Sequence, residues 1–146
     1  FPIYKAPYTV NQQEGQVLFG RGAYELYRTK DATYVTATYR CPEDWWFFNF
    51  NSGWAIIDNK RGDRYMLREV EYYPTDTCFW IKDSRDKFVR FVLVFPPLPK
   101  KVKTVDFFIP SGESRFNFDG SEKHMSGLRV EDLRPKHRIP QGEVIR

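Results

Sequence analysis

The stretch from Phe88 to Ile109 constrains the fold of this chain more than any other. It reads FVRFVLVFPPLPKKVKTVDFFI, two apolar runs joined by a connector of proline and lysine. Successive side chains of a strand point to opposite faces. The first run therefore places four apolar side chains on one face: Val89, Phe91, Leu93 and Phe95. Proline cannot donate to a sheet ladder, so the connector ends the first strand and forces a stiff crossing.

The connector Pro96-Pro97-Leu98-Pro99-Lys100 is expected to be structural. A proline-rich segment serves as a ligand for aromatic grooves only where it is free and accessible. This one is held at both ends by the most apolar runs of the chain. Leu98 is its lone apolar side chain, and we expect it to be buried beneath the connector.

Other segments also read as short strands. Thr33 to Cys41 alternates as a half-buried strand does. Its expected inward side chains are Val35, Ala37, Tyr39 and Cys41, and its expected outward ones are Tyr34, Thr36, Thr38 and Arg40. Trp45 to Phe50 is aromatic on both faces, which predicts a central strand or one whose outer face is covered. Turn signals recur every eight to twelve residues, and no window favours a helix. We predict an all-β, two-sheet immunoglobulin-like β-sandwich with little or no helix, because the connector crosses rather than turning tightly.

The length of 146 residues suits one domain with a real core. We expect an irregular N-terminal segment over residues 1–21, the sandwich over residues 22–133, and a C-terminal tail or linker over residues 134–146. A net charge of +4 is too mild to argue for nucleic acid. No apolar run approaches the ~20 residues that span a bilayer. Phe1 stands where an initiator Met would, so we expect a removed N-terminal segment, either a signal peptide or a trimmed portion.

Several motifs resemble one known family. They are Tyr-Glu-Leu-Tyr at 24–27, Thr-Tyr-Val-Thr-Ala-Thr-Tyr at 33–39, Trp45-Trp46, the Asp58 to Tyr65 loop, and Phe-Pro-Pro-Leu-Pro-Lys at 95–100 followed by Val-Asp-Phe at 105–107. Together they resemble an exported β-sandwich domain of Bacteroidetes, which occurs alone or ahead of thioredoxin-like domains. The resemblance implies an extracytoplasmic location, in the periplasm or on the cell surface. It implies no activity and no catalytic residues, and the chain lacks the Cys-x-x-Cys that a redox role needs.

Cys41 and Cys78 are the two cysteines of the chain. With Trp54 between them they mimic the Cys…Trp…Cys order of immunoglobulin domains, although 78 − 41 = 37 residues is a short separation. Two alternatives stay open. They form a disulfide, as exported proteins allow, or they are two buried thiols that act as small hydrophobes.

The chain shows no convincing catalytic or metal constellation. His124 and His137 lie far apart and near no cysteine pair, so we expect neither metal nor cofactor. Five acidic residues offer carboxylates for a hydrolase: Asp58, Asp63, Glu69, Glu71 and Asp76. Ordinary solvated charge explains them more simply. Two basic clusters are interpreted as solubilising, edge-protecting charge: Lys100, Lys101 and Lys103, and Arg134, Lys136 and Arg138.

Aromatic residues offer the best candidate site. The six candidates are Trp45, Trp46, Trp54, Tyr72, Tyr73 and Trp80. Alternation puts Trp45 and Phe47 on the face opposite to Trp46, so they cannot all enter one core. An exposed aromatic face can stack a sugar ring or contact a protein. The alternative is an outer face covered by the N-terminal segment.

These observations favour a non-enzymatic, extracytoplasmic module that binds or positions a protein or glycan at the cell envelope. A carbohydrate-binding module that uses the aromatics is the first alternative. A hydrolase that uses the acidic residues is the second and weaker one.

Overall fold

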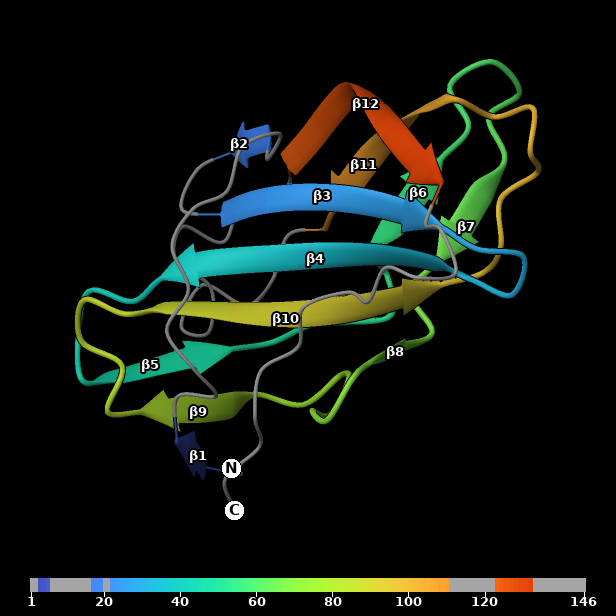
Figure 1. The fold of residues 1–146 in the computed structure, drawn as a ribbon. Coiled ribbons are helices and arrows are strands. Elements are labelled where there is room, and N and C mark those ends of the chain that lie inside the picture. The colour runs from blue at the N-terminus through green and yellow to red at the C-terminus, as the bar shows by residue number, and fades with distance from the viewer. Residues whose placement is uncertain (1–2, 6–16, 20–21, 111–122, 133–146) are drawn as a thin grey trace.

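The structure is a computed structural model that describes residues 3–5, 17–19, 22–110 and 123–132 (Figure 1). Every regular element in these ranges is a strand and none is a helix, which confirms the predicted all-β class. The strands are β1 (Ile3–Lys5), β2 (Val17–Phe19), β3 (Gly22–Arg28), β4 (Thr33–Arg40), β5 (Trp45–Phe48), β6 (Ala55–Ile57), β7 (Arg64–Met66), β8 (Glu69–Val70), β9 (Phe79–Lys82), β10 (Phe88–Phe95), β11 (Thr104–Ile109) and β12 (Lys123–Asp132).

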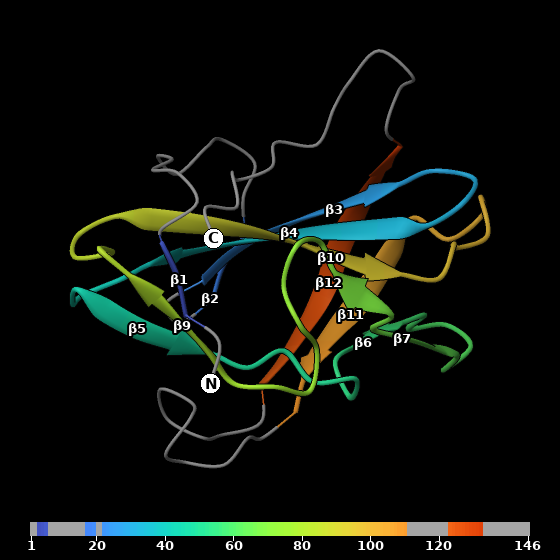
Figure 2. The same ribbon diagram turned by 90° about the horizontal axis from the view of Figure 1, so that it is seen from below.

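The strands form two sheets that pack together as a sandwich, as predicted. The small sheet has the order β1-β9-β5, and the large, curled sheet has the order β7-β6-β11-β12-β3-β4-β10-β8, with β2 paired to β3 (Figure 2). The expected path of the proline connector was wrong. The proline connector between β10 and β11 does not cross from one sheet to the other, because both strands belong to the large sheet and β12, β3 and β4 lie between them.

One folded ribbon links the two sheets. In the large sheet Arg40 of β4 pairs with Phe88 of β10, and in the small sheet Trp45 of β5 pairs with Lys82 of β9. The four strands are therefore two arms of one antiparallel ribbon, bent between β4 and β5 on one side and between β9 and β10 on the other (Figure 2). Cys41 holds this corner, since its amide donates to the Lys87 carbonyl across 2.9 Å.

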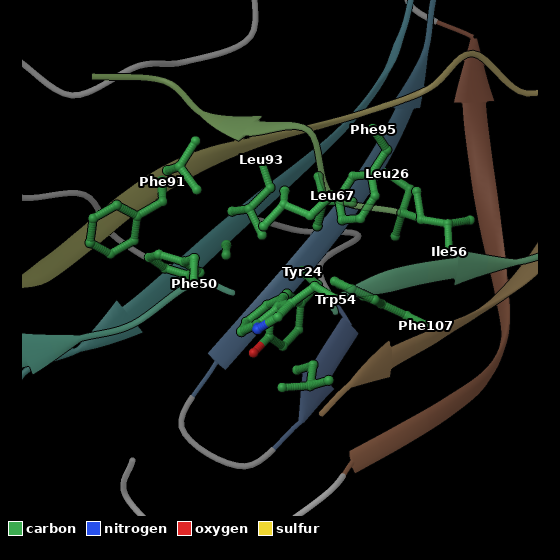
Figure 3. Packing of buried hydrophobic residues seen from close by; sticks show 14 of the residues in the cluster. Tyr24, Leu26, Phe50, Trp54, Ile56, Leu67, Phe91, Leu93, Phe95 and Phe107 are labelled. Atoms are coloured by element: carbon green, nitrogen blue, oxygen red, sulfur yellow. The ribbon is translucent and has the colours of Figure 1, made fainter. Parts of the chain in front are cut away.

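The core between the sheets is aromatic. Phe91 of β10 lies 4.8 Å from Phe48 and 4.9 Å from Phe50, measured between ring centroids (Figure 3). The four side chains predicted to share one face of β10 are all fully buried in this core. Leu98 is buried as predicted. The Arg28 guanidinium fastens the connector above it by donating to the carbonyl oxygen of Pro99 across 2.7 Å.

The middle of the far side of β4 is buried as well, which corrects the half-buried prediction there, whereas Tyr34 is half-buried and Arg40 is exposed as expected. Thr36 and Thr38 point away from the core as expected, yet each is only 2% exposed. Arg90 of β10 is buried on the same side and donates from Nε to the Thr38 hydroxyl across 3.1 Å. A strand buried on both faces needs apolar or hydrogen-bonded side chains on each, and the small threonines meet this need.

The ends of the predicted domain also need correction. Residues 1–21 were expected to be irregular, but β1 and β2 lie within them and pair with β9 and β3. Strand β12 begins at Lys123. Gly127 (φ 68°) lies at the register shift in the pairing of β12 with β11, between Met125 and Leu128. The tail expected at residues 134–146 lies outside the described residues.

Candidate functional site

The outer face of the small sheet collects the exposed aromatic side chains of the ribbon. Ile3 of β1 pairs with Trp80 of β9, and Trp80 pairs with Phe47 of β5, so the three form one row across the sheet. Trp45 stands in the next row, opposite Lys82. Alternate side chains of a strand share a face. The side chains that point away from the core are therefore those of Ile3, Trp45, Phe47, Trp80 and Lys82. We call Ile3, Trp45, Phe47 and Trp80 the aromatic platform.

The platform combines exposed groups with groups held by ring contacts. Trp45 is 49% exposed and Ile3 is 51% exposed, whereas Phe47 and Trp80 are half-buried. The Phe47 ring meets the Trp80 indole edge-to-face at 5.3 Å, and Trp46 stacks beside Phe47 at 6.0 Å. Such contacts limit the rotamers of Phe47 and Trp80, so the surface is partly ordered before any ligand arrives.

Only two of the six predicted aromatic residues belong to the platform, namely Trp45 and Trp80. Trp54 and Tyr73 are core residues: Trp54 packs against Phe50 at 5.2 Å, and Tyr73 stacks on Phe79 at 5.0 Å. Burial with little access to water also raises the pKa of Tyr73. For these two, the prediction of an exposed ligand contact was wrong.

The remaining two candidates occupy other positions. Trp46 alternates to the inner side of β5 and packs against the core. Tyr72 is 53% exposed, but it lies in the turn that follows β8, at φ 68°, and not on the small sheet. The structure also corrects the position of β5, which is an edge strand and not a central one.

Two platform residues were missed as site candidates. Phe47 carried a usable signal, since alternation already placed it on the face of Trp45. Ile3 carried none, because its place depends on the pairing of β1 with β9, which are more than seventy residues apart in the sequence. The alternative was an outer face covered by the N-terminal segment. Strand β1 does not cover this face, because β1 extends the sheet at its edge and leaves Trp45 exposed.

A polar rim borders the platform at the corner of the ribbon. Asp44 precedes Trp45 and pairs with Arg85 across 3.3 Å, and Arg40 pairs with Asp86 across 3.2 Å. The side chains of both pairs are more than half exposed. Exposed pairs of this kind add little stability, so their donors and acceptors can be used by a ligand at little cost to the fold.

The cysteines are two buried thiols. Cys41 and Cys78 are both free and both buried, so of the two open alternatives the structure shows the second and not the disulfide. Burial raises the pKa of the Cys41 thiol to about 11, partly offset by its hydrogen bond with Ser84. Burial also raises the pKa of Cys78. Both thiols therefore stay protonated near neutral pH, whereas the thiolate is the reactive form of cysteine.

The five acidic candidates are spread over three places with separate structural tasks. Asp58 is buried and caps the β6–β7 hairpin by accepting from the Lys60 amide across 3.0 Å, while Asp63 of the same hairpin pairs with Arg61. Asp76 accepts from the Ser52 amide across 2.9 Å.

Glu69 and Glu71 flank the end of β8. Burial raises the pKa of Glu71, and the neighbouring Glu69 carboxylate raises it further. The structure therefore does not bring the five acidic candidates together at one place.

His124 contacts a carboxylate and not a metal cluster. Its Nε2 lies 3.4 Å from Oδ2 of Asp106, whose Oδ1 accepts from the Gly127 amide across 3.1 Å. Among the described residues, no group of three or more His, Cys, Asp or Glu side chains could hold a metal ion. His137 and the basic residues Arg134, Lys136 and Arg138 lie outside the described ranges, whereas Lys100, Lys101 and Lys103 are exposed.

The part of the chain that the structure describes contains no helix long and apolar enough to cross a membrane. No protein-family model, curated protein or solved structure matched this chain. The geometry of the platform is therefore the basis on which a function can be proposed.

Proposed function

We propose that this chain is a non-enzymatic binding or positioning module that acts outside the cytoplasm, and that its ligand contacts the aromatic platform. One observation supports the proposal above all. Trp45 and Ile3 leave half of their surface in water on the same face that carries Phe47 and Trp80. Grouped apolar side chains on a surface are typical of interaction sites, whereas single exposed ones are not.

The extracytoplasmic location is supported by the resemblance to an exported β-sandwich domain, on the motifs at 95–100 and 105–107. It is part of the proposal and is tested separately, by the location of the protein in fractionated cells. Recovery of the protein in the cytoplasmic fraction would contradict it.

A glycan is the ligand class that fits the chemistry of the platform best. A sugar ring has apolar C–H faces, which stack on indole and phenyl rings, and polar edges, which need donors and acceptors nearby. Trp45 and Trp80 supply rings on neighbouring strands, and Lys82 and Asp44 lie beside Trp45. Ring and rim together match this amphipathic character better than a purely apolar surface would.

The test is an array of oligosaccharides, followed by affinity gel electrophoresis in the polysaccharide that gives the strongest signal. We expect retardation of the wild type and at least about tenfold weaker binding by Trp45→Ala and by Trp80→Ala, since ring stacking and apolar contact are together worth more than about 1.4 kcal/mol. Circular dichroism should confirm that both variants keep the strand signal.

Tyr72→Ala is the matched control, because Tyr72 is as exposed as Trp45 but lies off the platform. It should bind like the wild type. Absence of binding to every glycan would exclude this ligand class and leave a protein partner as the candidate. Equal binding by Trp45→Ala, Trp80→Ala and the wild type would exclude the platform itself.

A further inference from the structure

Strand β1 is attached to the sandwich through a single neighbour. It contains three residues and pairs only with β9 among the described strands, in parallel register from Ile3 opposite Trp80 to Lys5 opposite Lys82 (Figure 1). Parallel pairing at an edge requires no tight turn between the two strands. The position of β1 therefore depends on what β1 contacts and not on how the chain leads to it.

Tyr4 is the anchor of β1. Its ring meets Tyr73 edge-to-face at 5.0 Å and Phe79 at 5.7 Å with an interplanar angle of 90°. Ile3 beside it points outward and is half exposed. The edge of β9 that β1 occupies, with the rings of Tyr73 and Phe79 beneath it, is thus a slot for a short extended segment with an aromatic side chain at its centre.

We propose that this slot also accepts Ile3–Lys5 of a second copy of the chain, so that two copies exchange β1. The occupant fits without any change, because it is identical to the strand that fills the slot within one chain. Eleven residues, 6 to 16, separate β1 from β2, and a fully extended segment of that length reaches at most about 40 Å. That reach is comparable with the width of a small domain, so the slot of a neighbouring copy is accessible.

Exchange is governed by concentration. Within one chain β1 is tethered, and its effective concentration at its own slot is high. A second copy competes only when the protein concentration approaches that value, so the exchanged dimer should form on concentration and dissociate on dilution. The proposal can be tested apart from the glycan site, because Trp45 and Phe47 lie on β5, at the opposite edge of β9. Ile3, the platform residue on β1, would be supplied by the second copy.

The first test is sedimentation equilibrium across protein concentrations that extend into the millimolar range. We expect a reversible monomer–dimer equilibrium for the wild type and no association for a chain that lacks residues 1–5, because that chain has no strand to exchange. Met66→Ala is the matched control, since Met66 is another exposed apolar residue but lies on β7, and it should dimerise like the wild type. Unchanged dimerisation of the chain that lacks residues 1–5 would overturn the proposal, because association would then use another surface.

The second test measures the slot directly, with a fluorescent peptide of residues 1–7 and anisotropy as the readout. The folded Tyr4→Ala chain should bind this peptide, and a peptide carrying the same Tyr4→Ala change should bind at least tenfold more weakly. No binding to the folded variant would overturn the slot. Peptide binding by a chain that stays monomeric at every concentration would overturn the second copy as its occupant.

A third measurement needs no variant, in case Tyr4→Ala does not fold. Equal amounts of ¹³C-labelled and unlabelled wild-type chains are mixed at high concentration, and isotope-filtered spectra are recorded. Contacts between the Tyr4 ring of one copy and the Phe79 ring of the other are expected. A dimer without these contacts would contradict strand exchange.

Discussion

The Ser84 hydroxyl donates to the carbonyl oxygen of Glu43 across 2.9 Å, and this bond joins the two sides of the ribbon corner. Ser84 is fully buried, and its amide also donates to the Asp44 carbonyl across 3.2 Å. The contact matters for the platform, because the corner determines where β5 and β9 lie relative to β4 and β10.

Replacing Ser84 by alanine should lower the free energy of unfolding by about 1–3 kcal/mol, since the hydrogen bonds of a buried hydroxyl are lost. Urea titration measures the change. Ser52→Ala is the control: its hydroxyl also contacts an oxygen, that of Asp76 at 3.3 Å, but on the exposed surface. A loss below about 0.5 kcal/mol is expected there, and equal losses in the two variants would contradict the importance of the corner.

Phe91 and Phe107 should both be costly to truncate, because both are buried in the aromatic core. We expect Phe91→Ala and Phe107→Ala each to lower the free energy of unfolding by about 3–5 kcal/mol through lost burial and cavity formation. Denaturant titration of the two variants beside Met66→Ala provides the comparison. Losses below about 1 kcal/mol in both would place these rings at the surface.

The two thiols should be unreactive in the folded protein. Cys41 and Cys78 are buried, and burial raises the pKa of Cys41 to about 11, so almost no thiolate is present at pH 8. A thiol reagent such as DTNB should react with neither in native buffer and with both in denaturant. A mass two hydrogens lower in the native, non-reduced protein would reveal a disulfide and contradict the structure.

Asp106 should make stability depend on acidity. Desolvation raises its pKa, but hydrogen bonds from the Gly127 amide, Asn59 and His124 outweigh that effect, and the folded pKa lies below the ordinary 3.8. A carboxyl with a lowered folded pKa contributes stability above its unfolded pKa and loses it as the pH falls through the folded one. The stability gap between the wild type and Asp106→Asn should therefore shrink as the pH falls below about 4. A gap that does not change between pH 6 and pH 3 would contradict this.

Sequence reasoning was accurate where burial follows from alternation within one strand. The inward face of β10 was predicted because Val89, Phe91, Leu93 and Phe95 alternate along one strand, and the burial of Leu98 because it is the lone apolar side chain of the connector. It was less accurate for the candidate site. In the sequence nothing distinguished Trp54 and Tyr73 from Trp45 and Trp80 as aromatic candidates. In the structure the first two are core residues and the second two lie on the platform.

The sequence by itself determined the strand class, the main core strands and the faces that alternate along each of them, because these depend on neighbours two residues apart. Only the tertiary structure decided which of those faces meets water. Thr36 and Thr38 are buried on a face that alternation marks as outer, whereas Trp45 is exposed on the outer face of the small sheet. The row of Ile3, Trp80 and Phe47 exists because three distant segments pair in one register. Such pairing is a non-local choice among many strands of similar pattern, and no local periodicity encodes it.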